Sequence, residues 1–298
     1  MEIYRKLEKS EYPQSIALGF FDGVHLGHKA VIENAAKASQ KTAVLTFSEN
    51  PSKELFSKTS HKLISNEDKL ECFEKLGVDA VYMLDFSDIK DIEAESFLED
   101  ILLDTLKVSK ISCGYNYRFG KGGKGDTNLI RSFGEKNGIE INITDEVFYE
   151  NESISSTKIR SLIENGEMAL ANKLLGKNFG FKSQVEYGRQ IGSKIGFPTL
   201  NQQFPKDFVM PKFGVYVSQV MIDGKYYRSI TNVGVKPTVK SDYALAETHI
   251  FDFSGDLYGK TISLELMHFL RAEKKFESIE ELRKTIASDC EKARNFIK

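Results

Sequence analysis

Strand-like and helix-like segments take turns along residues 15–144 of this 298-residue chain, and that order restricts the fold strongly. We expect strands at Ser15–Leu18, Thr42–Phe47, Ala80–Leu84, Lys110–Cys113 and Glu140–Thr144. We expect helices at His28–Ser39, Asn66–Leu76 (with Asn66 as N-cap), Ala94–Leu103 and Thr127–Asn137, followed by Ser155–Ile163 and Met168–Leu175. Repeated alternation of this kind predicts a parallel sheet covered by helices on both faces.

After Lys177 the pattern changes to one strand after another. We expect strands at Phe181–Tyr187, Val215–Ile222, Tyr226–Val233, Ala246–Phe253 and Thr261–Phe269, then a helix at Glu277–Ile297. Asp-Gly at 223–224 is a hairpin signal between two alternating runs. The fold class is therefore α/β plus β, with a parallel-sheet domain at 1–180 and an antiparallel β-barrel domain with a terminal helix at 181–298.

The composition argues against several classes of protein. A net charge of −2 is unlike that of a general nucleic-acid-binding protein. Cys72, Cys113 and Cys290 lie far apart without a Cys-x-x-Cys, which predicts neither a disulfide framework nor a zinc ribbon. No apolar run approaches the ~18–20 residues of a membrane span, and the N-terminus lacks the apolar core of a signal peptide. We expect a cytoplasmic protein without nucleic-acid or membrane partners.

A glycine-rich loop joins the first strand to the first helix, and it reads Gly-Phe-Phe-Asp-Gly-Val-His-Leu-Gly-His over residues 19–28. Ligands of parallel sheets bind beyond the carboxyl ends of strands, and the N–H groups that open a helix suit phosphate. We expect His25 and His28 to face that phosphate and to stabilise charge during transfer. A bare His-x-x-His is more often a pair of surface histidines, but the glycines and the strand-to-helix context favour a site. The other residues of the loop expected at this phosphate site are Gly19, Phe20, Asp22, Gly23 and Gly27.

A second phosphate-binding turn is expected at residues 154–160, Ile-Ser-Ser-Thr-Lys-Ile-Arg. The hydroxyls of Ser155, Ser156 and Thr157 enter a helix, and Arg160 follows one turn later. Such a turn both caps a helix and binds anions, although Ser-Ser-Thr alone is often no more than a cap.

Together the two motifs resemble the nucleotidyltransferase superfamily. Their particular form resembles the FMN adenylyltransferase module of bacterial bifunctional riboflavin kinase/FAD synthetases. The resemblance implies a Rossmann-like nucleotidyltransferase domain in which His25 and His28 contact ATP phosphates. It also implies that Ser155, Ser156, Thr157 and Arg160 close over the triphosphate. The role of Asp22 is not assigned by the sequence.

Residues 114–121, Gly-Tyr-Asn-Tyr-Arg-Phe-Gly-Lys, resemble the flavin-side loop of the same family. The resemblance implies that Asn116 hydrogen-bonds the flavin and that Arg118 and Lys121 bind its phosphate; a solvated basic loop is the alternative. Residues 120–125 also satisfy Gly-x-Gly-x-x-Gly, with Asp145 at the distance of a ribose-binding acid. Residues 115–119 stand between that first glycine and its strand, and the loop is basic, which argues against a dinucleotide site.

Another glycine-rich, basic loop lies at residues 188–201 and leads into Pro-Thr-Leu-Asn. Thr199 and Asn201, two apart on an extended segment, point the same way and offer hard oxygen ligands for Mg²⁺. Glu247 is a carboxylate in an otherwise apolar strand and is able to take the proton of an attacking hydroxyl. Standing alone, such a residue is more often an outward-facing strand glutamate. The remaining ATP-binding residues expected here are Gly192, Lys194 and Pro198.

These motifs occur in the order seen in riboflavin kinases, together with residues 231–238 and 269–276. The resemblance implies Thr199 and Asn201 on Mg²⁺–ATP, Glu247 as the base for the ribityl 5′-hydroxyl, and Arg271 near the flavin. Three positions depart from the family pattern. Asn50 lies in Glu-Asn-Pro where the family has Pro-His-Pro, Ser193 stands where many relatives have Arg, and Leu200 where Ala is usual.

We therefore expect a Mg²⁺- and ATP-dependent enzyme with two activities. The barrel converts riboflavin and ATP to FMN and ADP, and the first domain converts FMN and ATP to FAD and pyrophosphate. One alternative is an intact kinase whose first domain is slow or uses another acceptor, given Asn50. The other is a flavin-binding regulator without turnover, which the retention of Glu247, both histidines and both phosphate loops disfavours.

Overall fold

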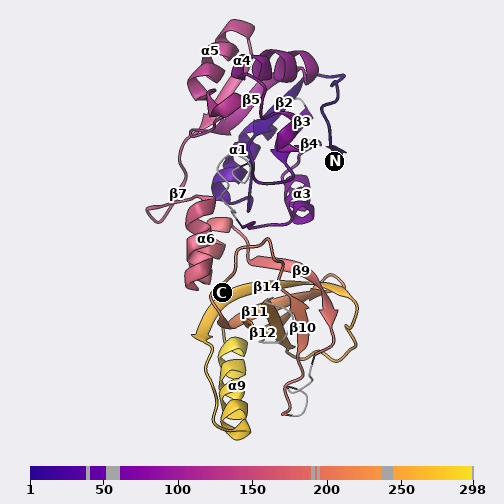
Figure 1. Cartoon of the computed structure of the whole chain (residues 1–298), viewed down its shortest axis with the longest axis vertical. Coiled ribbons are helices and arrows are strands. Elements are labelled where there is room, and N and C mark those ends of the chain that lie inside the picture. The colour runs from indigo at the N-terminus through magenta and orange to yellow at the C-terminus, as the bar shows by residue number, and fades with distance from the viewer. Residues whose placement is uncertain (38–40, 52–60, 189–191, 193–194, 236–243, 297–298) are drawn as a thin grey trace. The chain divides into compact units, whose positions relative to one another are not determined.

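The computed structural model describes the chain except for residues 38–40, 52–60, 189–191, 193–194, 236–243 and 297–298 (Figure 1). By its internal contacts the chain forms two compact units, Met1–Ser156 and Thr157–Lys298. The division by sequence into residues 1–180 and 181–298 stays a prediction. None of the described helices is long and apolar enough to cross a membrane.

The first unit is built on a six-stranded sheet whose described strands all run parallel. The order across the sheet is β1-β4-β3-β2-β5-β6. The strands are β1 (Glu2–Tyr4), β2 (Gln14–Leu18), β3 (Lys41–Phe47), β4 (Ala80–Leu84), β5 (Val108–Gly114) and β6 (Glu140–Thr144). A short hairpin of β7 (Phe148–Tyr149) and β8 (Glu152–Ser153) follows. The predicted parallel sheet is confirmed.

Helices cover both faces of this sheet because its strands are apolar on both sides. Along β2, Ala17 packs on the face covered by α1 (Leu26–Ala36) and α3 (Asn66–Lys75). Its neighbours Ile16 and Leu18 pack on the opposite face. That face is covered by α4 (Ala94–Ser96), the π-helix η2 (Phe97–Thr105) and α5 (Thr127–Asn137) (Figure 1). Short 3₁₀ turns complete the unit at η1 (Phe86–Asp88) and η3 (Lys121–Gly123).

One predicted helix cap is wrong by one residue. Ser65, not Asn66, is the N-cap of α3, because the Ser65 hydroxyl accepts from the backbone N–H of Asp68. Asn66 instead donates its side-chain amide to the carbonyl of Ser48. Both residue types are good N-caps, so the sequence alone does not separate them.

The strand order places a crevice beyond the carboxyl ends of β2 and β5. These two strands are neighbours, and from them the chain builds outward in opposite directions, through β3 and β4 on one side and β6 on the other. In an open parallel sheet, ligands bind at such a reversal of strand order. The fold therefore brings together the loop that follows Leu18 and the loop that begins at Gly114.

The second unit is a closed antiparallel barrel in the order β10-β13-β12-β11-β14-β9. Its strands are β9 (Phe179–Glu186), β10 (Leu200–Gln203), β11 (Gly214–Ile222), β12 (Lys225–Val235), β13 (Ala244–Ile250) and β14 (Thr261–Ala272). Asp223 (φ 49°) and Gly224 (φ 78°) both have positive φ, the geometry of a tight hairpin turn. The predicted barrel and hairpin are confirmed, and β10 is a strand that the sequence predicted only as an extended segment.

Among the described residues, three helices accompany the barrel: α6 (Ser156–Asn165), α7 (Met168–Leu175) and α9 (Ile279–Arg294). Helix α7 packs on β9 and β14, and α9 packs on β12. Cys290 and Ala293 of α9 share an apolar cluster with Val215, Val217 and Ile230 of the strands. The terminal helix therefore lies against the face of the barrel that carries these apolar side chains.

Candidate active sites

The turn from β2 into α1 has an unusual backbone. Phe21 (φ 55°), Gly23 (φ 84°) and Val24 (φ 46°) all have positive φ. This region costs a residue with a side chain about 1–2 kcal/mol, and it is a marked outlier for a β-branched residue such as Val24. Such strain persists only where the surroundings hold the chain in place.

Asp22 supplies part of that restraint. Its side chain is 3% exposed, and its Oδ1 accepts from the backbone N–H of Leu63 at 2.9 Å. Its carbonyl accepts from the Ser156 hydroxyl at 3.0 Å. Asp22 therefore ties the loop to two distant segments, which is a structural task that the sequence did not assign.

The two histidines of the loop lie side by side. His25 is the N-cap of α1 and its Nδ1 accepts from the backbone N–H of His28 at 3.2 Å. The two imidazole rings stack with centroids 3.5 Å apart and an interplanar angle of 18°. Gly27 makes room for this arrangement, because a Cβ there would come within 3.2 Å of the His25 ring. Two imidazoles at a helix N-terminus form a site suited to an anion.

A cavity of ≈ 430 Å³, the first cavity, opens at this point. It is lined by segments that follow β2, β3, β4, β5 and β6. The sequence-predicted residues that line it are Gly19, Phe20, His25, Gly27, His28, Asn116, Arg118, Ser155 and Ser156. Asp22, Gly23 and Lys121 are not among its lining residues. Thr157 and Arg160 lie in α6 and belong to the second unit, so their predicted contact with the triphosphate stays a prediction.

The flavin-side loop carries positive charge that is already partly paired. The Arg118 guanidinium lies 3.6 Å from the Asp126 carboxylate, and the Lys121 ammonium lies 3.9 Å from Glu93. Gly120 (φ 71°) packs so closely on the Ala94 backbone that a Cβ would come within 2.7 Å of it. The loop is thus held against the start of α4, with Arg118 at the cavity and Lys121 outside its lining.

The sequence did not predict the apolar wall of the first cavity. This wall consists of the aromatic side chains Phe47, Phe86, Phe97, Tyr117 and Phe119. The rings of Tyr117 and Phe119 stack at 5.8 Å, and burial raises the pKa of the Tyr117 hydroxyl. These residues come from four separate segments, so no single sequence motif predicts them.

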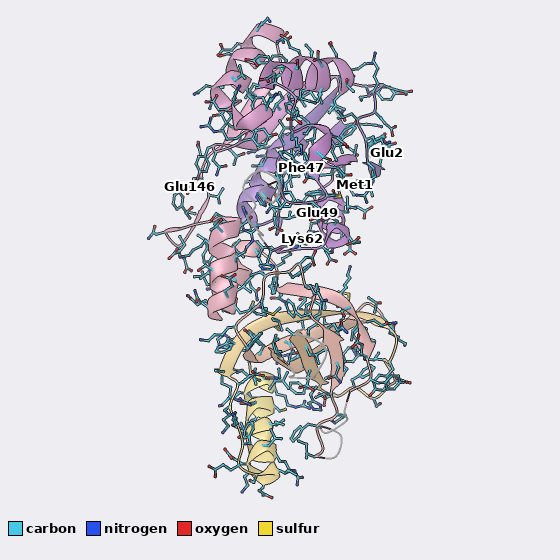
Figure 2. The ribbon with its side chains drawn as sticks, in the orientation of Figure 1. Met1, Glu2, Phe47, Glu49, Lys62 and Glu146 are labelled. Atoms are coloured by element: carbon cyan, nitrogen blue, oxygen red, sulfur yellow. The ribbon has the colours of Figure 1, made fainter. Side chains whose placement is uncertain are left out.

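The segment after β3 also reaches the first cavity, through Pro51. Beside it, Glu49 and Lys62 form an ion pair of 2.9 Å (Figure 2). Asn50, the departure from the family pattern, is half-buried and is not among the residues that line the cavity.

A second cavity of ≈ 420 Å³ lies in the second unit, between the face of the barrel and helix α9. Asn201 on β10, Glu247 on β13 and Asn232 on β12 are direct cross-strand neighbours, and all three line it. Directly opposed residues in a sheet share a face. The row therefore holds a carboxylate between two amides along one wall of the cavity.

The donor set next to Glu247 fits a hard cation. Asn201 is 6% exposed, and its Oδ1 is buried without a hydrogen-bond partner among the described residues. The Gly188 backbone comes so close to this amide that a Cβ would lie 2.0 Å from Asn201 Nδ2. Thr199, two residues before Asn201, lines the same cavity. An amide oxygen and a hydroxyl are ligands that Mg²⁺ accepts.

The other residues predicted to bind ATP in the loop at 188–201 do not all line the second cavity. Gly192 lines the second cavity and its carbonyl accepts from the Phe197 N–H at 2.8 Å. Pro198 does not line the cavity; its carbonyl accepts from His249 Nδ1 at 2.8 Å. Lys194 and Ser193 lie outside the described residues. Leu200 is buried, 9% exposed.

Arg271 fixes helix α9 to the barrel at the edge of the second cavity. Its Nε and Nη2 each lie 2.8 Å from Oδ2 of Asp289, whose carboxylate is almost fully buried. Both residues line the cavity. The predicted flavin residue Arg271 therefore also has a structural partner that the sequence did not identify.

Comparison with known proteins matches both units. Residues 7–158 match the family model described as FAD synthetase, and residues 175–297 match the one described as riboflavin kinase. The bifunctional riboflavin kinase/FMN adenylyltransferase of Listeria monocytogenes is 36% identical over 97% of this chain and 94% of its own length. The Bacillus subtilis protein of the same name is 33% identical over 96% and 94%. This chain belongs to that family.

One solved structure is similar to this family member over its whole length. It is titled a macrolide-efflux protein from Streptococcus pneumoniae, with a TM-score of 0.91, 29% sequence identity and full coverage of both chains. The family models and the relatives of known name confirm the predicted family over both units. The role of each site residue stays a prediction.

Proposed function

We propose that the second unit phosphorylates riboflavin with ATP to give FMN, and that the first unit adenylylates FMN with a second ATP to give FAD. The observation that carries this proposal is the presence of two separate cavities. Each is built within one unit and each is lined by the motif residues of one activity. Both cavities have the size usual for small-molecule sites.

In the kinase step, Glu247 is the general base. The ribityl 5′-oxygen of riboflavin attacks the γ-phosphorus of ATP, the bond to the β–γ bridging oxygen breaks, and ADP leaves. Glu247 takes the hydroxyl proton. Its place in a row with Asn201 and Asn232 sets the carboxylate beside polar groups that orient the reactants.

Thr199 and Asn201 would hold Mg²⁺, and the buried Oδ1 of Asn201, which has no hydrogen-bond partner among the described residues, supports this assignment. When bound, the cation neutralises phosphate charge. The apolar side of the cavity, formed by Val215, Ile230 and Leu282 among others, suits the flat ring of riboflavin. Arg271 stands at the edge of that apolar surface and is our candidate for a polar contact to the ring.

In the adenylyl-transfer step, a phosphate oxygen of FMN attacks the α-phosphorus of ATP and pyrophosphate leaves. His25 and His28 stabilise the charge that develops on the phosphates, together with the backbone N–H groups of Leu26 and Gly27 at the start of α1. Ser155 and Ser156 line the same cavity, and Thr157 and Arg160 follow them in sequence. No protein nucleophile is needed, because FMN supplies the attacking oxygen.

The flavin of this second step would lie against the aromatic wall of the first cavity. Asn116 would hydrogen-bond its ring and Arg118 would bind its phosphate, since both line that cavity. Lys121 would act on the phosphate only from outside the lining, beside Glu93. The three cysteines, all among the described residues, are in no disulfide, which fits our placement of the enzyme in the cytoplasm.

Labelled ATP tests the proposal atom by atom. With γ-labelled ATP and riboflavin, label should enter FMN and then FAD. With α-labelled ATP, label should enter FAD but not FMN. Label in FMN but never in FAD would limit the chain to a kinase, which is the outcome that the Asn50 departure favours. No label in either flavin would leave a flavin-binding regulator.

A further inference from the structure

Lys69 is a buried lysine in the first turn of helix α3. Its side chain is only 2% exposed. The N-terminal end of a helix disfavours positive charge and prefers acids such as its neighbours Glu67 and Asp68. The position of Lys69 is therefore set by what its ammonium contacts, since the helix gains nothing from a cation there.

The ammonium joins two segments that are distant in sequence. Lys69 Nζ donates to the carbonyl of Phe47 at 3.1 Å and to the carbonyl of Phe20 at 3.3 Å. It also lies 4.6 Å over the centre of the Phe20 ring. The Phe20 carbonyl accepts a second hydrogen bond from the Thr46 hydroxyl at 2.8 Å. One side chain thus binds both the end of β3 and the start of the glycine-rich loop.

The Phe47 carbonyl needs a donor because β2 leaves the sheet at this point. Gly19 N–H donates to the carbonyl of Leu45. The backbone carbonyls of alternate residues in a strand point to the same side, so the next carbonyl of β3 after Leu45 that points toward β2 is that of Phe47. Phe21, with φ 55°, has already turned away. The ammonium of Lys69 donates the hydrogen bond to the Phe47 carbonyl that a longer strand β2 would otherwise supply.

This contact lies where the strained loop begins. The positive-φ residues Phe21, Gly23 and Val24 follow Phe20 directly, and they lead to His25 at the start of α1. Phe20 and Phe47 line the first cavity, whereas Lys69 is not among its lining residues. Any effect of Lys69 on a reaction in that cavity must act through the loop.

Burial lowers the pKa of Lys69 to about 8, opposed by the charge of Asp22. Lys62 also lowers this pKa and Glu49 raises it. At neutral pH the side chain therefore carries its proton and all three N–H donors. The chain keeps a costly buried cation next to the loop.

We propose that Lys69 is a positioning residue for adenylyl transfer, holding the Phe20 and Phe47 carbonyls so that the loop presents His25 and His28 to the first cavity. The inference rests on the proposed function of the first unit. Small displacements of reacting groups are costly, about 100-fold in rate for 1 Å. The kinase site lies in the other unit and provides an internal control.

The test compares full-length wild type with Lys69→Met, Lys69→Arg and Lys75→Met. Methionine has a similar length but donates no hydrogen bond. Lys75 is an exposed residue of the last turn of the same helix, so Lys75→Met is the matched control. We expect Lys69→Met to lower kcat for FAD formation from FMN by about 10- to 100-fold, with KM for FMN changed by less than about threefold. Lys69→Arg, which restores donors, should recover part of the loss.

Two further readouts separate positioning from a general structural role. FMN formation from riboflavin should stay at the wild-type rate in all variants. The Tm of Lys69→Met should stay within about 4 °C of wild type, because loss of the buried charge offsets loss of its hydrogen bonds. A kcat for FAD formation within twofold of wild type would overturn the inference, as would an equal fall in both activities. If the wild type itself makes no FAD from FMN, it is the proposed function that fails.

Discussion

Replacing Asp289 by asparagine should loosen helix α9 from the barrel. The substitution keeps the shape of the side chain but removes the charge that two nitrogens of Arg271 contact at 2.8 Å. Breaking a buried ion pair costs about 3–5 kcal/mol because it leaves the partner charge uncompensated. The Arg271 side chain is 25% exposed and Asp289 is 4% exposed, so water recovers part of that cost. We expect a loss of about 2–3 kcal/mol.

A loss of this size should lower the Tm of the second unit by about 6–12 °C. Scanning calorimetry of the full chain measures it, and riboflavin kinase activity retained after heating identifies the transition that belongs to this unit. Leu282 and Ile286 of α9 line the second cavity, so KM for riboflavin should also rise several-fold. FAD formation from supplied FMN should not change.

Asp252→Asn is the matched control. It makes the same chemical change in an ion pair of 2.8 Å with Arg294, the last residue of helix α9. Both side chains of that pair are largely exposed, and exposed pairs contribute little to stability. The Tm of Asp252→Asn should stay close to that of wild type. A Tm for Asp289→Asn equal to that of the control would refute our reasoning about the buried clamp.

Three further predictions address the two sites and their pH dependence. Glu247→Gln should abolish FMN formation and spare FAD formation from FMN, whereas His28→Ala should do the reverse. One assay that measures both products checks each variant. Loss of both activities in either variant would contradict two independent sites. Gly188→Ala should abolish kinase activity, because the new Cβ would collide with the Asn201 amide at 2.0 Å; near-normal kinetics would contradict the assigned role of that amide. Burying the charged Lys69 side chain lowers the free energy of unfolding, because the folded protein binds the proton more weakly than the unfolded chain. This cost should have its full size below pH about 8 and should vanish above about 10.5. Wild type should therefore gain stability relative to Lys69→Met between these pH values, measured by denaturant unfolding, and a constant difference would contradict the lowered pKa.

The architecture could be predicted because the sequence repeats its signals. Strands β2, β3, β4 and β5 of the first unit are each followed by a helical pattern, and strands of the barrel are followed by turn residues. Short elements without periodicity were harder to predict. Strand β10, Leu-Asn-Gln-Gln, has no apolar alternation and is defined only by its pairing with β9 and β13.

Site residues that act through local motifs could also be found. His25 and His28 are three residues apart, and Thr199 and Asn201 are two apart, so spacing alone places each pair together. The residues that hold these motifs could not be found in this way. Asp22 binds the backbone of Leu63, and Lys69 binds two carbonyls far away in sequence. A lysine in an amphipathic helix is indistinguishable from a solvated one until the partners are known.

The most direct test of the two-site account is a time course with wild-type protein, riboflavin, ATP and Mg²⁺, in which the flavins are separated chromatographically. We predict that FMN appears first and FAD follows, with supplied FMN converted to FAD without a lag. FMN that accumulates without FAD, or riboflavin that is never consumed, would contradict it.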